Sequence, residues 1–422
     1  MNTPTARKKL GPFLLSGLMI GPILGSGIIF LPPLVYQVMG NWALVGWMFI
    51  VGLSYFFATI FGKLSILLPG DAGVAGSIET AFGRRVKRLA SFYLIGAVLF
   101  GPVPVLLTAA RFLHPFFSLA EPLLAMIFLG GCVLMLLRQV SSIGRISFVM
   151  SSLVALTLVA GATVTLILHS HLQLSLPPFS RQQFGSGLLL LFWTMVGWEV
   201  VGNYSGDVRN PETTIPRAVF CSFLIIALVS LTVAAGVQMI APSMISGQTV
   251  SITDLIYPLF GPATDAIMAV LVSSLCITSY LLFTGGTARL ASFIAAEGHL
   301  PGFLAKKGRN GAPVSAILVL AFIHLAALAA VHLHLTDMAE LVALADGFFI
   351  ANSLIGIIAA IRLLPGRLIK GAAVMLALLV ASIFFHAGII VISIILMMAV
   401  FCLAEPLQSI RTYRAIHKEQ QG

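Results

Sequence analysis

Charged residues are scarce in this sequence. They make up 9% of the 422 residues, whereas 59% are hydrophobic and the mean hydropathy is +1.05. A soluble domain carries about 25% charged residues, so a chain of this length has too few charges to cover a surface that faces water. The shortage excludes a soluble globular protein and predicts that most of the surface faces lipid.

Cysteine is also scarce, and its placement excludes two kinds of site. The four cysteines lie far apart in apolar runs, at Cys132, Cys221, Cys276 and Cys402. Their spacing matches neither a metal-binding motif nor a disulfide framework. The sequence also lacks a phosphate-binding loop, a nucleophile elbow and a pair of catalytic carboxylates. We therefore expect no enzyme activity, no bound metal and no cofactor.

Long apolar runs are what the sequence does contain. A helix that spans a bilayer needs about 20 apolar residues, whereas strands of a lipid-facing barrel have ~10 residues of alternating polarity. The runs are too long and too uniform for strands, so we expect an all-α integral membrane protein with twelve transmembrane helices. These are expected at 11–34, 42–67, 89–112, 122–137, 147–168, 186–205, 218–240, 263–288, 313–332, 341–361, 370–385 and 387–404.

The basic residues are distributed unevenly between the loops that this count creates. With the N-terminus inside, only Arg111 and Arg181 of the 24 lysines and arginines fall in outer segments. This is the asymmetry of the positive-inside rule, and it predicts that both termini are cytoplasmic. The formal net charge of +10 then faces the anionic lipid of the inner leaflet, so we expect no nucleic-acid partner.

Two of the runs carry glycines where a continuous helix would be expected. The first contains GPILGSGIIFLPP, residues 21–33, and the sixth contains LLLLFWTMVGWEVVGNYSG, residues 188–206, with a glutamate at Glu199. Gly and Pro are the poorest helix formers, and broken backbone is too costly to face lipid, so it must line a protein cavity. Transporters built from inverted repeats of five helices carry such breaks at corresponding positions in both halves.

A broken helix exposes backbone groups that suit a zwitterion. The N–H groups at the start of a half-helix attract a carboxylate, and the C=O groups at the end of the facing half-helix attract an ammonium group. Two alternatives remain open. A glycine in a membrane helix also serves close packing against a neighbour. The intramembrane carboxylate of Glu199 indicates a function, but it also suits a structural hydrogen bond to the first helix.

These stretches resemble the amino acid–polyamine–organocation transporter superfamily. Residues 25–29, GSGII, followed by Pro32, are similar to its first-helix signature, and residues 192–218 are similar to the motif of its sixth helix and the following loop. The twelve helices and FGPVPVLL at 100–107 look most similar to the bacterial branch that exports methionine and branched-chain amino acids. Shorter matches in two inner loops lie at Pro69, Gly73, Phe82, Gly83, Arg289, Glu297, Gly298 and Pro301.

The resemblance implies a fold and a domain organisation. It implies a LeuT-like 5+5 inverted repeat with broken helices one and six, plus two C-terminal helices. Residues 1–404 would form a single transmembrane transporter domain. Within it we expect repeat one at about 11–168, repeat two at about 186–361 and helices eleven and twelve at about 370–404. A cytoplasmic tail would follow at 405–422.

The resemblance also implies a substrate site built mainly from backbone at the two breaks. The carboxylate and part of the ammonium group would be held around Ile23, Gly25, Ser26 and Gly27. Carbonyls near Trp193 and Val196, just before Gly197, would complete the ammonium site. Tyr280 in helix eight lies near the place where some relatives have an aromatic lid.

Coupling and gating are assigned to charged residues near the sixth and tenth helices: Glu199, Asp207, Arg209 and Asp346. Arg209 belongs to a loop that resembles an inner gate, although an ordinary helix-capping loop is the alternative. Asp346 lies in an apolar stretch and is expected to be a second titratable residue. Some proton-coupled relatives carry a lysine in helix five, and residues 146–166 have none. Ser151 and Ser152 there suit either a cation site or helix packing, so the coupling ion stays open between a proton and another ion.

The residues around the two breaks also predict the substrate. They are apolar apart from Glu199, at Ile23, Leu24, Phe192, Trp193, Met195, Val196 and Trp198. A cationic side chain would enter such a pocket without a partner, which is costly. We therefore predict a secondary transporter of neutral apolar amino acids, such as methionine, leucine, isoleucine or valine, in the bacterial cytoplasmic membrane.

Several readings remain open beside this one. The direction is open between export and import, and another amino acid or an amine is the alternative substrate. A membrane enzyme would need a polar catalytic cluster at one interface, and a channel would need polar stripes along several helices. The expected partners are a small-molecule substrate, a coupling ion and membrane lipid, with no partner subunit evident.

Overall fold

A computed structural model describes residues 11–67, 73–138, 143–169, 176–198, 208–241, 250–308 and 311–404. All the secondary-structure elements in these ranges are helices. The first half contains α1 (Pro12–Leu24), α2 (Gly27–Met39), α3 (Ala43–Leu67), α4 (Gly73–Phe82), α5 (Arg84–Phe100), α6 (Pro102–Leu113), α7 (Glu121–Arg138) and α8 (Ile143–Leu168).

The described elements of the second half are helices too. It contains α9 (Arg181–Leu191), the 3₁₀ helix η3 (Phe192–Met195), α11 (Pro211–Ile240), α12 (Ile252–Phe260), α13 (Thr264–Ala296), α14 (Val314–His332), α15 (Met338–Leu363), α16 (Arg367–Phe384) and α17 (Ile389–Ala404). Four shorter 3₁₀ turns join elements: η1 (Gly40–Trp42), η2 (His114–Phe116), η7 (Gly261–Ala263) and η8 (Gly302–Ala305).

Within the described residues each expected apolar run contains one or two helices, and the end of the sixth run lies outside them. By length and composition, nine helical stretches among the described residues suit a membrane span, so the exact number of crossings stays a prediction. One boundary differs: the first run was expected to end at residue 34, but α2 continues through Pro32 and Pro33 to Met39. Membrane helices tolerate proline because surrounding protein satisfies the freed backbone groups.

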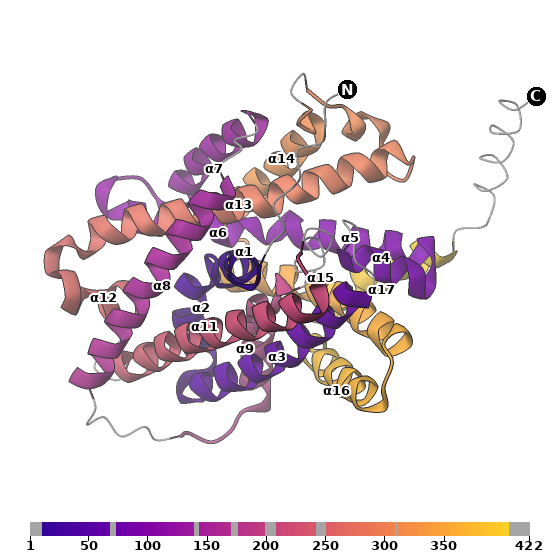
Figure 1. Cartoon of the computed structure of the whole chain (residues 1–422). Coiled ribbons are helices and arrows are strands. Elements are labelled where there is room, and N and C mark those ends of the chain that lie inside the picture. Colours follow the sequence, from indigo (N-terminus) through magenta and orange to yellow (C-terminus); the bar gives the residue numbers. More distant parts are fainter. Residues whose placement is uncertain are drawn as a thin grey trace, which may run out of the picture.

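The helices pack around a central group formed by α1, α2, α9 and η3 (Figure 1). On one flank α11 packs against α1, α3 and α8, and on another α15 packs against α4, α5 and α16. The largest fully buried side chains include Trp47, Phe57, Phe192 and Trp198. Broken segments therefore lie inside the protein, where their backbone is shielded from lipid.

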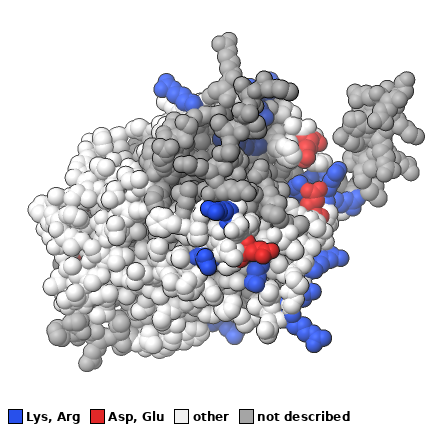
Figure 2. Space-filling view, in the orientation of Figure 1, with Lys and Arg blue, Asp and Glu red and all other residues white. Residues whose placement is uncertain are grey.

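The outer surface is apolar, as a surface in contact with acyl chains must be. Phe322, Leu378 and Val270 are 70%, 67% and 66% exposed. Lys and Arg side chains gather on the right-hand and upper parts of the face seen in Figure 2, near α4, α5 and α17, while the left of that face is almost uncharged. Such an uneven distribution is expected for a membrane protein whose basic loops lie on one side of the bilayer.

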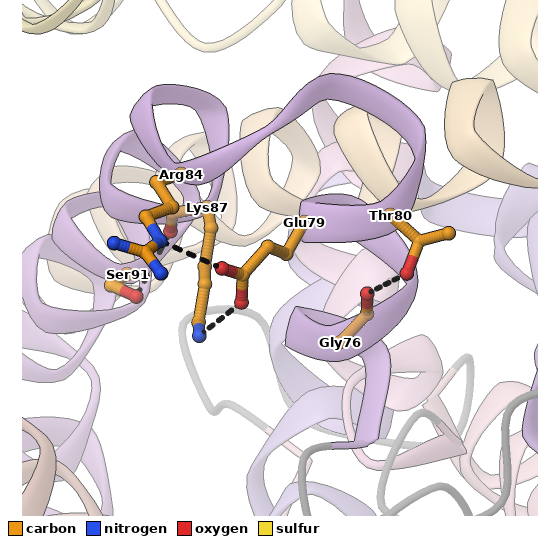
Figure 3. Close-up of polar contacts among 6 residues, drawn as sticks. All are labelled: Gly76, Glu79, Thr80, Arg84, Lys87 and Ser91. Atoms are coloured by element: carbon orange, nitrogen blue, oxygen red, sulfur yellow. Dashed lines mark hydrogen bonds and ion pairs between the residues drawn. The ribbon is translucent and has the colours of Figure 1, made fainter.

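A short aqueous corner joins α4 to α5 (Figure 3). Glu79 accepts a hydrogen bond from Nζ of Lys87 at 2.6 Å, and its Oε1 lies 3.4 Å from Nε of Arg84. Gly83, which separates the two helices, has a φ of +83° that an L side chain rarely adopts. The hydrogen bond from Lys87 is the main reason that the pKa of Glu79 is lowered.

Candidate functional site

The first helix is broken where the sequence predicts. α1 ends at Leu24 and α2 begins at Gly27, while Gly25 has a φ of +30°. Ser26 is 2% exposed and makes no side-chain cap. The first N–H groups of α2 lack acceptors within their own helix, so this buried break presents donors to whatever lies beside it.

The sixth helix is broken in a similar way. α9 passes into η3, then Val196 is extended with φ −69° and ψ 128°, and Gly197 has a φ of +113°. The prediction that Gly197 stands at a break is confirmed. Glu199 and Asp207 lie outside the described residues, so their predicted roles stay predictions.

The two breaks face each other through Trp193. A Cβ atom built on Gly27 would lie 2.7 Å from Cδ1 of Trp193 and 3.0 Å from its Nε1. The indole also meets the ring edges of Phe30 and Phe349, with centroid distances of 5.6 and 6.3 Å. Gly27 therefore lets the sixth-helix tryptophan lie directly on the backbone of the first.

A small cavity of about 10 Å³ adjoins Trp193. The described residues that line it are all apolar: Val98, Gly101, Pro102, Trp193, Val196, Phe283 and Phe349. This volume holds about one water-sized sphere, so the structure is a closed state in which Trp193 and Phe349 occupy the space between the helices.

Asp346 lies at the same break. Its side chain is 0% exposed, and its Oδ2 accepts a hydrogen bond from the backbone N–H of Trp193 at 3.1 Å. Its Oδ1 has no hydrogen-bond partner among the described residues. The neighbouring Ala345 is close to Gly101, another cavity residue. The structure thus brings Asp346 to the backbone of the sixth-helix break, although it is not among the residues that line the cavity.

Tyr280 lies elsewhere than expected. Its hydroxyl is 3.0 Å from Nδ1 of His324 in α14, and it is not among the residues that line the cavity. Phe283, from the same helix α13, lines the cavity instead. Nε2 of His324 donates to the carbonyl oxygen of Val98 at 2.8 Å, so Tyr280 belongs to a buried chain of hydrogen bonds beside the cavity wall.

The remaining predicted residues lie away from the cavity. Arg209 is exposed just before α11, and the carbonyl of the following Asn210 accepts bonds from Thr213 and Thr214. This geometry favours the helix-capping alternative for that loop. In α8, Ser151 is buried at 3% exposure and Ser152 is half-buried.

Sequence reasoning missed the third helix as a part of the site. Gly101 separates α5 from α6, and Pro102, the first residue of α6, has no N–H to bond the carbonyl of Val98. FGPVPVLL was noticed only as a family resemblance, although its prolines signal a break. His324, a histidine inside an apolar run, was the other available signal.

Comparison with known proteins finds relatives among transporters. The chain shares 26% identity over 363 residues with the L-methionine/branched-chain amino acid exporter YjeH of Escherichia coli, covering 83% of this chain and 85% of that one. It shares 24% identity over 367 residues with the uncharacterized amino acid permease YecA of Bacillus subtilis, covering 83% and 84%. The putrescine transporter PotE of Escherichia coli is 24% identical over 331 residues, covering 75% and 74%.

Among solved structures, a manganese transporter mutant of Eremococcus coleocola matches with a TM-score of 0.61 and 14% identity, covering 96% of each chain. That likeness shows the fold, which is all-α. The described residues contain no group of three His, Cys, Asp or Glu side chains that suits a metal ion. The family model for amino acid permeases matches residues 10–415. This chain is a multi-pass membrane protein that belongs to the amino acid permease family of transporters.

Proposed function

We propose that this chain is a secondary active transporter of neutral apolar amino acids such as methionine, leucine, isoleucine and valine, and that it exports them. The observation that carries the proposal is the contact of the two broken helices at Trp193, beside a cavity whose described lining residues are apolar. The similarity to a methionine and branched-chain exporter supports the same substrate class.

In this proposal the backbone binds the head of the substrate and the aromatic rings bind its side chain. The N–H groups at the start of α2, beside Ser26, meet the carboxylate, and carbonyls near Trp193 and Val196 meet the ammonium group. Trp193, Phe283 and Phe349 enclose an apolar side chain. A charged side chain would lose its hydration there without gaining a partner among the wall residues.

Transport requires that the closed site open to each side in turn. We propose a 5+5 inverted repeat in which α1, α2, α3, α9, η3 and α11 rock against the other helices, with helices α16 and α17 outside the repeat. Contact between the rings of Trp193 and Phe349, which joins the rocking group to α15, holds the present closed state. Both termini are proposed to be cytoplasmic, on the side of the basic residues.

Counterflow in proteoliposomes tests the function. Vesicles loaded with unlabelled methionine should accumulate external radiolabelled methionine or leucine, and vesicles without the protein should not. Labelled lysine and putrescine, the latter the named substrate of one relative, serve as the comparison. Faster exchange of lysine or putrescine than of leucine would contradict the proposed substrate class, and no counterflow of any amino acid would contradict transport.

A further inference from the structure

One oxygen atom at the sixth-helix break is buried without a partner. Oδ2 of Asp346 accepts the N–H of Trp193, but Oδ1 has no hydrogen-bond partner among the described residues, and the side chain is fully buried. An ionised carboxylate is strongly disfavoured in such a place unless a cation or several donors compensate it. A proton on Oδ1 removes the charge, so the closed state suits the neutral carboxylic acid.

The helices around α15 supply no compensating cation. The basic side chains on the helices packed against it are Lys63 of α3, Arg84, Arg85, Lys87 and Arg88 of α5, Arg111 of α6, Arg181 of α9, and Arg367 and Lys370 of α16. The other titratable groups there are Tyr55, Glu79, Tyr93 and Cys402, and α15 itself adds Glu340 and Arg362. None forms an ion pair or hydrogen bond with Asp346 in the described structure.

We propose that Asp346 is the proton-binding site that couples transport to the proton gradient, an inference that rests on the proposed function. On one side of the membrane hydronium transfers a proton to Oδ1, which forms an O–H bond and leaves a water molecule. On the other side the O–H bond breaks and water accepts the proton. The carboxyl cycles between acid and carboxylate, with no other reactant.

Its position links the proton to the substrate. Asp346 bonds the N–H of Trp193, and the carbonyls proposed for the substrate ammonium belong to Trp193 and Val196 in the same short segment. A substrate ammonium there favours the ionised carboxylate, and a bound proton removes that attraction. Proton and amino acid therefore weaken each other's binding, and such coupling is reciprocal. Mutual exclusion at one site gives exchange of a proton for an amino acid.

Asp346→Asn is the informative variant. The amide keeps the size of the side chain and an oxygen that accepts from Trp193, but it does not take up a proton at physiological pH. Glu340→Gln is the matched control, since it makes the same carboxyl-to-amide change at the exposed start of the same helix. Asp346→Glu keeps a carboxyl group at this position and tests whether proton coupling requires one.

Three measurements on purified full-length protein in proteoliposomes test the proposal, with L-methionine as the probe. For the wild type and Glu340→Gln, methionine affinity at low pH should fall by up to about tenfold for each unit by which the pH is lowered. Addition of external methionine should also make the lumen of the vesicles more alkaline. Asp346→Asn should bind methionine more weakly than the ionised wild type, its methionine affinity should no longer depend on pH, and it should lose the proton movement. Asp346→Glu should regain proton movement.

The outcomes separate the two proposals. If Asp346→Asn still moves protons with methionine as the wild type does, Asp346 is not the coupling site, although counterflow would still support transport. If the wild type shows counterflow without any proton movement, proton coupling itself is overturned. If the wild type shows no counterflow, the proposed substrate is wrong, and the coupling proposal falls with it.

Discussion

Nε2 of His324 donates a hydrogen bond to the carbonyl oxygen of Val98 at 2.8 Å. In a continuous helix that carbonyl would accept from residue 102, but Pro102 has no N–H. Since a carbonyl only accepts, the hydrogen must reside on Nε2, and a neutral ring then accepts from Tyr280 through Nδ1. A side chain from α14 thus satisfies the backbone at a break that borders the cavity.

Replacing His324 should therefore destabilise the protein. His324→Leu leaves a buried carbonyl and a buried hydroxyl without partners, each at a cost of about 1–3 kcal/mol. The expected result is a clearly lower thermal unfolding midpoint in detergent. His332→Leu, an exposed change at the end of the same helix, should leave the midpoint nearly unchanged. Equal midpoints for the two variants would mean that the bond to Val98 contributes little.

Substitution of Gly27 should impair substrate binding. Gly27→Val places a branched side chain against Trp193 and disturbs the half-helix start that is proposed to meet the carboxylate. Loss of one charge-assisted hydrogen bond costs about 1.5–3 kcal/mol, or about one to two decades of affinity, and steric occlusion adds to this. Ser26→Ala keeps the backbone N–H and should cost less.

Gly52→Val is the control for the Gly27 experiment, because a Cβ atom at Gly52 meets nothing within 4 Å. Binding of radiolabelled methionine to each purified variant supplies the measurement. A Gly27→Val protein that folds and binds methionine like the wild type would show that the first-helix glycines serve packing alone.

The corner between α4 and α5 should respond to pH. The pKa of Glu79 is lowered in the folded protein, first by its hydrogen bond with Lys87. The stabilisation is therefore present above the unfolded pKa, for which the ordinary value is 4.5, and is lost as the pH falls through the lower folded value. Because the pair is partly exposed, Glu79→Gln should cost only a few tenths of a kcal/mol, roughly.

Thermal midpoints at pH 7 and pH 3 provide the check. The difference between the wild type and Glu79→Gln should be present at pH 7 and should shrink at pH 3. A difference that grows on acidification would contradict the assigned role of the carboxylate.

The orientation of the chain is testable by thiol labelling. In a background without the native cysteines, cysteines at His169 and His332 should react with an impermeant reagent from the periplasmic side, because the basic residues are predicted to face inward. Cysteines at Arg85 and Lys307 should react only after the membrane is opened. Labelling of Lys307→Cys from outside would mean that the predicted helix count is wrong.

The sequence alone determined the fold class and the positions of the two breaks. Apolar runs of membrane length leave the backbone only one way to satisfy its hydrogen bonds, which is a helix. Glycines at positions 25 and 197 interrupt those helices because they tolerate backbone angles that other residues avoid. Both features depend on the local sequence, so they can be predicted without knowing which residues are close in the folded protein.

The tertiary structure alone decided which side chains meet at the breaks. Nothing local to Asp346 or His324 indicates that one bonds the backbone of Trp193 and the other that of Val98, from 153 and 226 residues away. For Tyr280 the rotation of α13 decided the outcome, turning it toward α14 and Phe283 toward the cavity. In lipid an apolar residue gains little from facing the protein interior rather than the acyl chains. The rotation of a helix about its axis is therefore set by packing against its neighbours, and the hydropathy of its own sequence does not predict it.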